Sequence, residues 1–264
     1  MAQNNDFEAG LFNVGIGSVL GGIGAVINKE PQEKFGKTLL KGIGQGALGG
    51  YLVFESKRLV REFAKSGNYR YVWPSKLVNS AGTSIIENAA ANRDFWERWH
   101  LNIGFNRFEL NTNENVKFKY RIMPFALFGT IAGFTKGQLS LSKSLKTGSF
   151  FFLTPELEDP YGRKAFGVAI TNSIVVLEDL PNTITEAHEL IHVYQFESFS
   201  SITWFLKKPL ENVDSKFYKF YSKIFYTDFN AIFYLGLSEI DKFTAKEYKD
   251  GFFEKEAYYF STFN

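Results

Sequence analysis

Two histidines and a glutamate lie within five consecutive residues of this sequence, at His188, Glu189 and His192, although the whole chain has only three histidines. On a helix, side chains four residues apart project from the same side, so the two imidazoles can bind one metal ion. Glu189 lies about 100° around the helix from His188, where its carboxylate can take a proton from water and pass it to a leaving amine. A single buried histidine is usually a hydrogen-bonded core residue, but this pair predicts a site for one divalent ion, which we expect to be zinc.

The residues around this motif predict the helix that it requires. Thr183 and Glu186 fit a capping box, and Pro181 suits a chain that enters a helix. Apolar residues then recur at helical spacing, so the helix is expected to be largely buried; they are Ile184, Ala187, Leu190, Ile191, Val193 and Tyr194. Gln195 lies seven residues after His188, nearly in line with it, and is placed for a hydrogen bond behind a metal-binding histidine.

A zinc site of this kind needs a third protein ligand and leaves one position open for water. His100 is one candidate, but no motif surrounds it. Glu254 and Ala257 share a helix face, and the small Ala257 would let their helix press against the histidine helix while Glu254 reaches the metal. Glu256 would then point elsewhere, so we favour Glu254 over Glu256 as the third ligand; both could also be solvated surface acids.

The motif has a recognisable order. Residues 172–177 read as a strand, residues 184–195 as Ile-Thr-Glu-Ala-His-Glu-Leu-Ile-His-Val-Tyr-Gln, and residues 254–257 as Glu-Lys-Glu-Ala. This order resembles the zincin metallopeptidases of the gluzincin type, above all small bacterial domains whose helix reads His-Glu-Leu-x-His-Val-x-Gln. The resemblance covers about residues 165–264.

The resemblance implies a set of roles. His188, His192 and Glu254 would hold one zinc ion, and Glu189 would be the general base of a peptidase. A peptide substrate would pair edge-on with the strand before the helix, residues 172–177.

The sequence departs from the family after Glu-x-x-Ala, where an acidic residue is replaced by Tyr258. Tyr258 and Tyr259 are the nearest candidates for a donor to the transition state. The motif itself assigns none.

Residues 11–54 hold two glycine-rich runs separated by a polar break at 28–37, and the first run, 11–27, contains no charge. Glycines fall four residues apart, close to one helical turn, at Gly17 and Gly21 and again at Gly42, Gly46 and Gly50. Such stripes let two backbones approach closely, which predicts a helical hairpin packed through glycine. Neither run reaches the ~20 strongly apolar residues of a membrane span, so we expect the hairpin to pack against protein or to lie on a membrane surface.

One pattern within this region is set aside. Residues 44–49 match the Gly-x-Gly-x-x-Gly signature of dinucleotide sites, which follows a buried strand. The preceding residues, 37–41, do not read as such a strand, so we expect no nucleotide site here.

The fold class follows from the order of the elements. Helical patterns precede residue 99, period-two alternation on both sides of an Asn-rich turn at 111–115 predicts a β-hairpin, and helices return beyond Pro181. The sequence therefore predicts an α+β protein with an N-terminal helical hairpin, a central antiparallel sheet and a C-terminal zincin-like region. We divide it into residues 1–99, glycine-rich and associated with a membrane surface or partner, and residues 100–264. The predicted helices are 51–64 and 84–99, and the predicted strands 101–105, 116–122, 138–142, 149–153 and 165–177.

Composition narrows the function. Hydrophobic residues make up 45% of the chain, which excludes wholesale disorder, and 17% are aromatic, which indicates a Phe-rich core or rings kept at an interface. The net charge is only +2, and the basic cluster Lys57, Arg58 and Arg61 reads as a solvated helix face, so nucleic acid is not expected as a partner. The absence of cysteine excludes disulfides and thiolate chemistry.

Two functions remain. The first is a zinc-dependent peptidase of the cell envelope that acts on a peptide or protein. The second is a non-catalytic accessory or scaffold subunit of an outer-membrane or envelope assembly that keeps the metal-binding fold. Both assume a location in the periplasm or at the outer membrane, because the polar start after Met1 looks like a cleavage junction from which an export signal has been removed.

Overall fold

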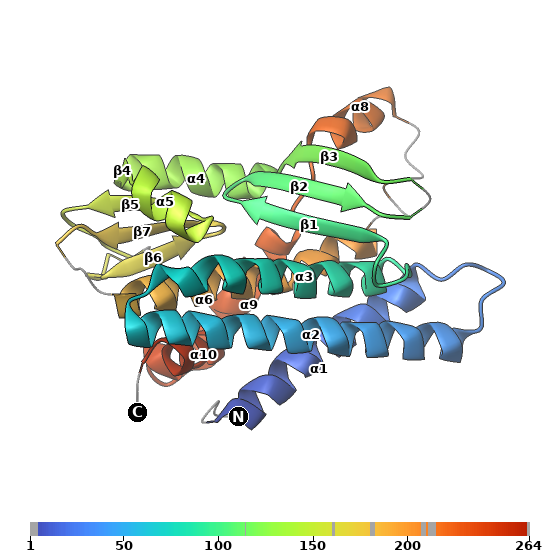
Figure 1. The fold of residues 1–264 in the computed structure, drawn as a ribbon, viewed down its shortest axis with the longest axis horizontal. Helices are drawn as coiled ribbons and strands as arrows, with labels where there is room; N and C mark the ends of the chain where they lie inside the picture. Colours follow the sequence, from blue (N-terminus) through green and yellow to red (C-terminus); the bar gives the residue numbers. More distant parts are fainter. Residues whose placement is uncertain are drawn as a thin grey trace.

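Three long helices form one side of the molecule (Figure 1): α1 (Asp6–Ile27), α2 (Phe35–Ser66) and α3 (Val72–Ala90). The structure, a computed structural model, describes residues 5–113, 115–159, 162–179, 183–206, 210 and 215–262. It is an α+β protein with an N-terminal helical region, as predicted. The predicted helix at 51–64 is the second half of α2, whereas the predicted helix at 84–99 ends at residue 90.

Glycine brings α1 and α2 into backbone contact. A Cβ on Gly46 would lie 2.1 Å from the carbonyl oxygen of Gly17, and a Cβ on Gly50 would lie 2.3 Å from that of Asn13. Only glycine fits at such distances, which confirms the predicted hairpin packed through glycine. The Gly-x-Gly-x-x-Gly pattern lies wholly inside α2.

Two sheets follow instead of one. The first contains β1 (Arg98–Ile103), β2 (Asn106–Asn111) and β3 (Lys117–Ile122), all antiparallel in that order. The second has the order β4-β5-β7-β6 and is mixed, because β5 (Phe150–Thr154) runs parallel to β7 (Ser173–Leu177). The prediction of an antiparallel arrangement is therefore wrong for this pair. Their continuous apolar runs suit strands that are buried on both faces, and such strands are typical of parallel pairs.

Three shorter elements also differ from expectation. The predicted strand at 165–177 is split into β6 (Gly167–Ile170) and β7 by a turn in which Thr171 has φ +55°; no glycine marks this turn. The predicted strand at 138–142 is reduced to β4 (Gln138–Leu139), followed by α5 (Leu141–Thr147). The helix α4 (Pro124–Lys136) was not predicted.

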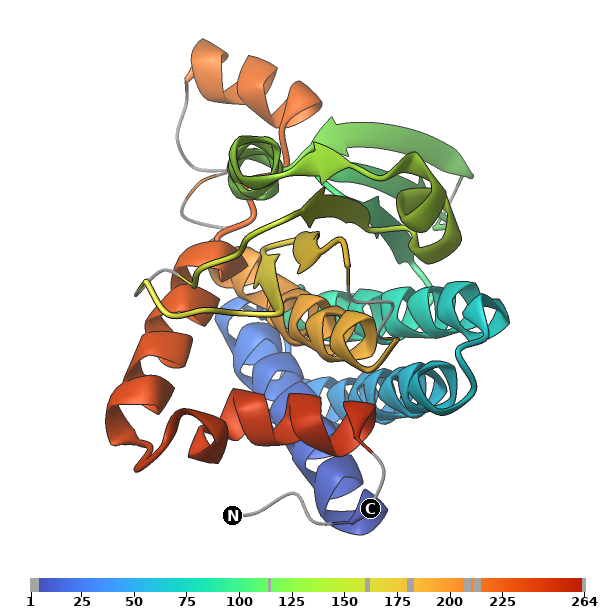
Figure 2. The ribbon, with the colours of Figure 1, turned by 90° about the vertical axis from the view of Figure 1, so that its left-hand side faces the viewer.

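The C-terminal part is helical, as expected. It contains α6 (Thr183–Ser198), η2 (Ser200–Leu206), α8 (Lys216–Ile224), α9 (Asn230–Thr244), η3 (Tyr248–Asp250) and α10 (Phe252–Ser261), and a further short turn, η1 (Tyr69–Tyr71), joins α2 to α3. In Figures 1 and 2, α6 lies between the second sheet on one side and the N-terminal helices on the other, and α10 crosses below it.

The largest buried apolar cluster crosses the predicted boundary at residue 99. It joins Phe63 of α2, Phe151 of β5, Tyr194 of α6 and Phe260 of α10. The N-terminal helices and the histidine helix therefore share one core, which fixes α6 from both sides.

We expect Gly46→Ala to destabilise the protein by about 1–3 kcal/mol, because the added methyl group would collide with the backbone of α1. Gly44→Ala is the matched control, since a Cβ there meets nothing within 4 Å; it should stabilise α2 by about 0.5–1 kcal/mol. Urea unfolding of both variants measures the difference. Equal effects at the two positions would contradict close packing through Gly46.

Candidate metal centre

Three predicted ligands meet where α10 crosses α6. The Nε2 atoms of His188 and His192 are 3.1 Å apart. The two oxygens of Glu254 lie 3.2 Å from Nε2 of His188 and 3.4 Å from Nε2 of His192. The donor atoms of the three residues all lie within 4.8 Å of one another.

The closest approaches of the three side chains resemble the ligand spacing around a tetrahedral ion, with a different oxygen of Glu254 facing each histidine. Zinc–ligand bonds of about 2.0–2.2 Å at tetrahedral angles place neighbouring donor atoms about 3.3 Å apart. The facing atoms are also all acceptors in their unprotonated forms, so they repel unless a proton or a cation lies between them. The donor set of His188, His192 and Glu254 is therefore suited to a divalent cation.

A side chain of α9, Asp241, holds the first turn of α10 in place. Both carboxylate oxygens of Asp241 accept backbone N–H groups at the start of α10, from Phe252 at 2.8 Å and from Phe253 at 3.0 Å. Glu254 is the next residue, so this cap sets the direction in which its side chain leaves the helix.

Gln195 holds the ring of His192. Its amide nitrogen donates to the carbonyl oxygen of Phe253 at 2.8 Å and to Oε2 of Glu256 at 2.9 Å. Its oxygen must then face Nδ1 of His192, 2.8 Å away, which makes Nδ1 the protonated nitrogen and leaves Nε2 free to bind a metal. The prediction placed Gln195 in line with His188; the residue that it contacts is His192.

The predicted capping box is wrong in its contacts. The hydroxyl of Thr183 donates to the carbonyl oxygen of Ala64 at 3.3 Å. The carboxylate of Glu186 accepts from the hydroxyl of Tyr69 at 2.6 Å and pairs with Lys143. These contacts tie the start of α6 to α2, η1 and α5. Pro181 lies outside the described residues.

Glu189 is buried against β6. A Cβ on Gly167 would lie 2.8 Å from both Cγ and Oε1 of Glu189, so glycine makes room for this side chain. Burial raises the pKa of Glu189, although the two histidines and a backbone N–H from Ala169 oppose the shift. The carboxyl group is thus able to take up a proton more readily than an exposed glutamate.

The tyrosines are arranged differently from the prediction. The ring of Tyr258 packs edge-on against His188 with centroids 4.6 Å apart, but Tyr259 donates to Asp6 at 2.6 Å and is engaged away from the centre. Tyr248 was not singled out in the sequence, yet burial and the nearby Glu254 carboxylate raise the pKa of its hydroxyl. The residues around Tyr248, in η3, form no sequence motif that would have identified it.

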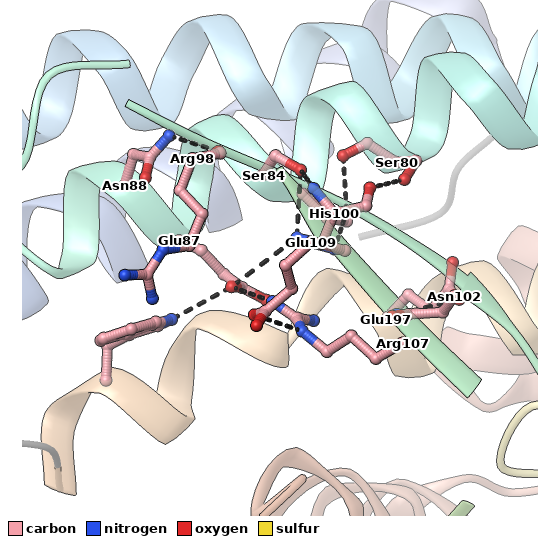
Figure 3. Close-up of polar contacts among 12 residues, drawn as sticks. Ser80, Ser84, Glu87, Asn88, Arg98, His100, Asn102, Arg107, Glu109 and Glu197 are labelled. Carbon is pink, nitrogen blue, oxygen red and sulfur yellow. Dashed lines mark hydrogen bonds and ion pairs between the residues drawn. The ribbon is translucent and has the colours of Figure 1, made fainter. Parts of the chain in front are cut away.

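The two alternative ligands lie elsewhere. His100 lies in a buried polar cluster on β1 and α3 (Figure 3). Its Nε2 is 3.1 Å from the hydroxyl of Thr83, and its Nδ1 is 3.0 Å from that of Ser84. Burial, together with the Arg107 guanidinium, lowers the pKa of His100 to about 4. In the same cluster Arg107 pairs with Glu87 at 2.7 Å, so His100 belongs to a structural network.

Glu256 points away from the two histidines. Its carboxylate pairs with Lys57 and accepts from Gln195 and Asn13. Lys57 is only 2% exposed, so the prediction of a solvated face is wrong at this position. The partner of Lys57 lies on α10, far along the chain, which no local pattern could reveal.

The expected substrate strand is also misplaced. Residues 172–177 form β7, which is hydrogen-bonded to β5 on one side and to β6 on the other. A peptide cannot pair with a strand that has partners on both sides. The outer strand beside α6 is β6.

Comparison of the chain with protein-family models, with curated proteins and with solved structures finds no match.

We expect metal binding to release a proton at neutral pH. Burial lowers the pKa of His192, but the nearby Glu254 carboxylate more than offsets this and raises the pKa to about 9. A metal must displace that proton, so the apparent zinc affinity should rise about tenfold per pH unit between pH 6 and 8. Calorimetry in buffers of different ionisation enthalpy measures the proton count.

His100→Gln is the control for this titration, because His100 lies outside the centre. It should leave the pH dependence unchanged. An affinity that does not vary between pH 6 and 8 would contradict a protonated His192.

Proposed function

We propose that this chain is a zinc-dependent peptidase of the cell envelope. His188, His192 and Glu254 would hold one zinc ion, and Glu189 would be the general base. The observation that carries the proposal is the meeting of two imidazole nitrogens and a carboxylate within 3.4 Å of one another, with the ring of His192 turned so that Nε2 faces the other two.

The charges of the buried groups near the centre support the binding of a doubly charged cation. Three largely buried carboxylates lie at or beside the centre, those of Glu189, Glu254 and Glu256, and the buried ammonium group of Lys57 pairs with Glu256. With neutral imidazoles, two further positive charges make this region neutral, and buried charge is stable only when it is balanced.

The residues of the chain supply the remaining steps. Bound zinc would act as a Lewis acid toward water and the substrate carbonyl. Glu189 would take a proton from the attacking water and deliver it to the leaving amine, a transfer suited to a carboxyl group whose pKa is raised. The hydroxyls of Tyr248 and Tyr258 are the nearest donors for the developing negative charge on the carbonyl oxygen.

A peptide substrate would lie along β6. This strand is the outer strand of its sheet, and Gly167 within it packs on Glu189. Addition of an extended peptide to a sheet edge would align a peptide bond beside the general base. Phe166, just before β6, is largely exposed and would contact a side chain of the substrate.

A membrane surface is the second partner that we propose. Of the helices that the structure describes, α1 is the one long and apolar enough to cross a membrane, with 39% of its most apolar window buried. Its exposed apolar residues recur four or eight apart from Phe7 to Ile27. Beside them an apolar groove of about 390 Å³ opens between α1 and α2, lined by Leu11, Tyr51 and Phe54 among others. Arg58 also lines it, but its guanidinium group pairs with Asp6 and Glu55. An apolar groove suits an acyl chain.

The alternative is the accessory or scaffold subunit of an envelope assembly. Large apolar side chains stand exposed on the outer helices, including Phe217 of α8 and Phe243 of α9, the latter 87% exposed. Surfaces of this kind are typical of proteins that bind partners. In that case the metal would stabilise the fold.

The catalytic proposal is tested with Glu189→Gln. We expect the variant to keep one zinc per chain by elemental analysis and to cleave a quenched fluorescent peptide library about 10²–10⁴-fold more slowly. His192→Ala should lose the zinc. Wild-type protein without stoichiometric zinc would overturn the site, and an active Glu189→Gln variant would favour the accessory subunit.

The membrane proposal is tested by flotation with phospholipid vesicles. We expect the Leu11→Ser/Val19→Ser double variant to lose most of its vesicle binding, because both side chains belong to the exposed stripe of α1. Phe118→Ser is the control, since Phe118 is exposed on β3 at the opposite side of the molecule (Figure 1). Equal losses in both variants, or no binding by wild-type protein, would contradict a docking role for α1.

A further inference from the structure

Lys57 is a buried ammonium group at the interface of three helices. Its Nζ lies 2.8 Å from Oε1 of Glu256 on α10 and 2.8 Å from the amide oxygen of Asn13 on α1. Asn13 in turn donates from its amide nitrogen to the same oxygen of Glu256 at 2.8 Å. Two donors from the glycine-rich hairpin therefore hold one oxygen of this carboxylate.

The other oxygen of Glu256 is connected to the candidate metal centre by hydrogen bonds through Gln195. Oε2 accepts the amide nitrogen of Gln195 at 2.9 Å, and the amide oxygen of Gln195 accepts Nδ1–H of His192. A carboxylate and a carbonyl oxygen can only accept, so Glu256 and Phe253 both require the nitrogen of Gln195 on their side. The oxygen is left for His192, and the hydroxyl of Tyr234 also donates to it at 3.3 Å. A reversed amide would donate to Nδ1 and favour the ring form that carries its proton on Nε2, where a metal binds.

We infer that Lys57 is a positioning residue of the metal centre, acting through Glu256 and Gln195 on the ring of His192. The inference rests on the proposed zinc site. Lys57 supplies the positive charge that keeps the Glu256 carboxylate in place, because a buried carboxylate without its counter-ion is strongly destabilised. Loss of a hydrogen-bond partner behind a metal ligand commonly weakens metal binding by about 10–100-fold. By this inference the hairpin of α1 and α2 contributes to metal binding through Lys57 and Asn13, although it carries none of the three proposed ligands.

The experiment compares Lys57→Met with Lys76→Met. Lys76 is equally buried, at 1%, and faces Glu197 of α6 at 3.5 Å. Within the described residues, neither Lys76 nor Glu197 is hydrogen-bonded to Gln195, His188 or His192. Both variants lose a buried charge and should lose stability. Zinc affinity, measured by chelator competition on folded protein, should fall about 10–100-fold in Lys57→Met and less than about threefold in Lys76→Met.

A double variant separates positioning from stability. Lys57→Met/Glu256→Gln has no unpaired buried charge, so it should regain stability over Lys57→Met. A glutamine at 256 can donate as well as accept, so the orientation of Gln195 would rest on Phe253 and Tyr234 alone, and zinc affinity should remain below that of wild-type protein. Recovery of affinity together with stability would show a merely structural pair and overturn the inference, as would equal losses in Lys57→Met and Lys76→Met.

A measurement without metal keeps the inference independent of the zinc proposal. In metal-free wild-type protein above pH 9, where the His192 ring is neutral, long-range ¹H–¹⁵N NMR should place the single ring proton on Nδ1, in Lys76→Met as well but not in Lys57→Met. If wild-type protein binds no zinc, the proposed function fails and this signal alone decides the role of Lys57. Its persistence in Lys57→Met would overturn that role.

Discussion

The arrangement around α6 depends on holding electron-rich groups against one another away from water. Two imidazole nitrogens and a carboxylate lie within hydrogen-bonding distance, and they repel whenever no positive charge lies among them. Such groups stay together only if the helices that carry them cannot move apart. Asp241 caps the start of α10, Ala257 is fully buried in the core that α10 shares with α6, and Tyr259 ties the end of α10 to Asp6.

The glycine-packed hairpin of α1 and α2 also helps to hold these groups together. Backbone contact between α1 and α2 places Asn13 and Lys57 close enough to share one oxygen of Glu256. Larger residues along the stripe would separate the two helices and with them these donors. The same helices carry Phe54 and Phe63 into the core against which α6 packs. Fold and centre are thus stabilised by one set of contacts.

Sequence alone was sufficient where the relevant spacing is short. The pair His188 and His192, their helix and the glycine stripe depend on neighbours within one or two turns, and Glu254 followed from its spacing to the small Ala257. The rest depends on contacts that no local pattern carries. Lys57 can be buried only because its partner, Glu256, lies on the last helix. The parallel pairing of β5 with β7 depends on a crossover connection between them. The turn at Thr171 contains no glycine that would have marked it in the sequence.

Two hydrogen bonds that hold α10 in place connect it to α1, far away in the sequence. Tyr259 and Asp6 are separated by 253 positions, and Glu256 and Asn13 by 243. During synthesis the histidine helix leaves the ribosome well before α10, so a growing chain offers two imidazoles without the carboxylate that completes the set. The three proposed ligands should accordingly come together only after α10 has left the ribosome and packed against α6. Sequence separation thereby delays assembly of the candidate metal centre until the last helix has folded.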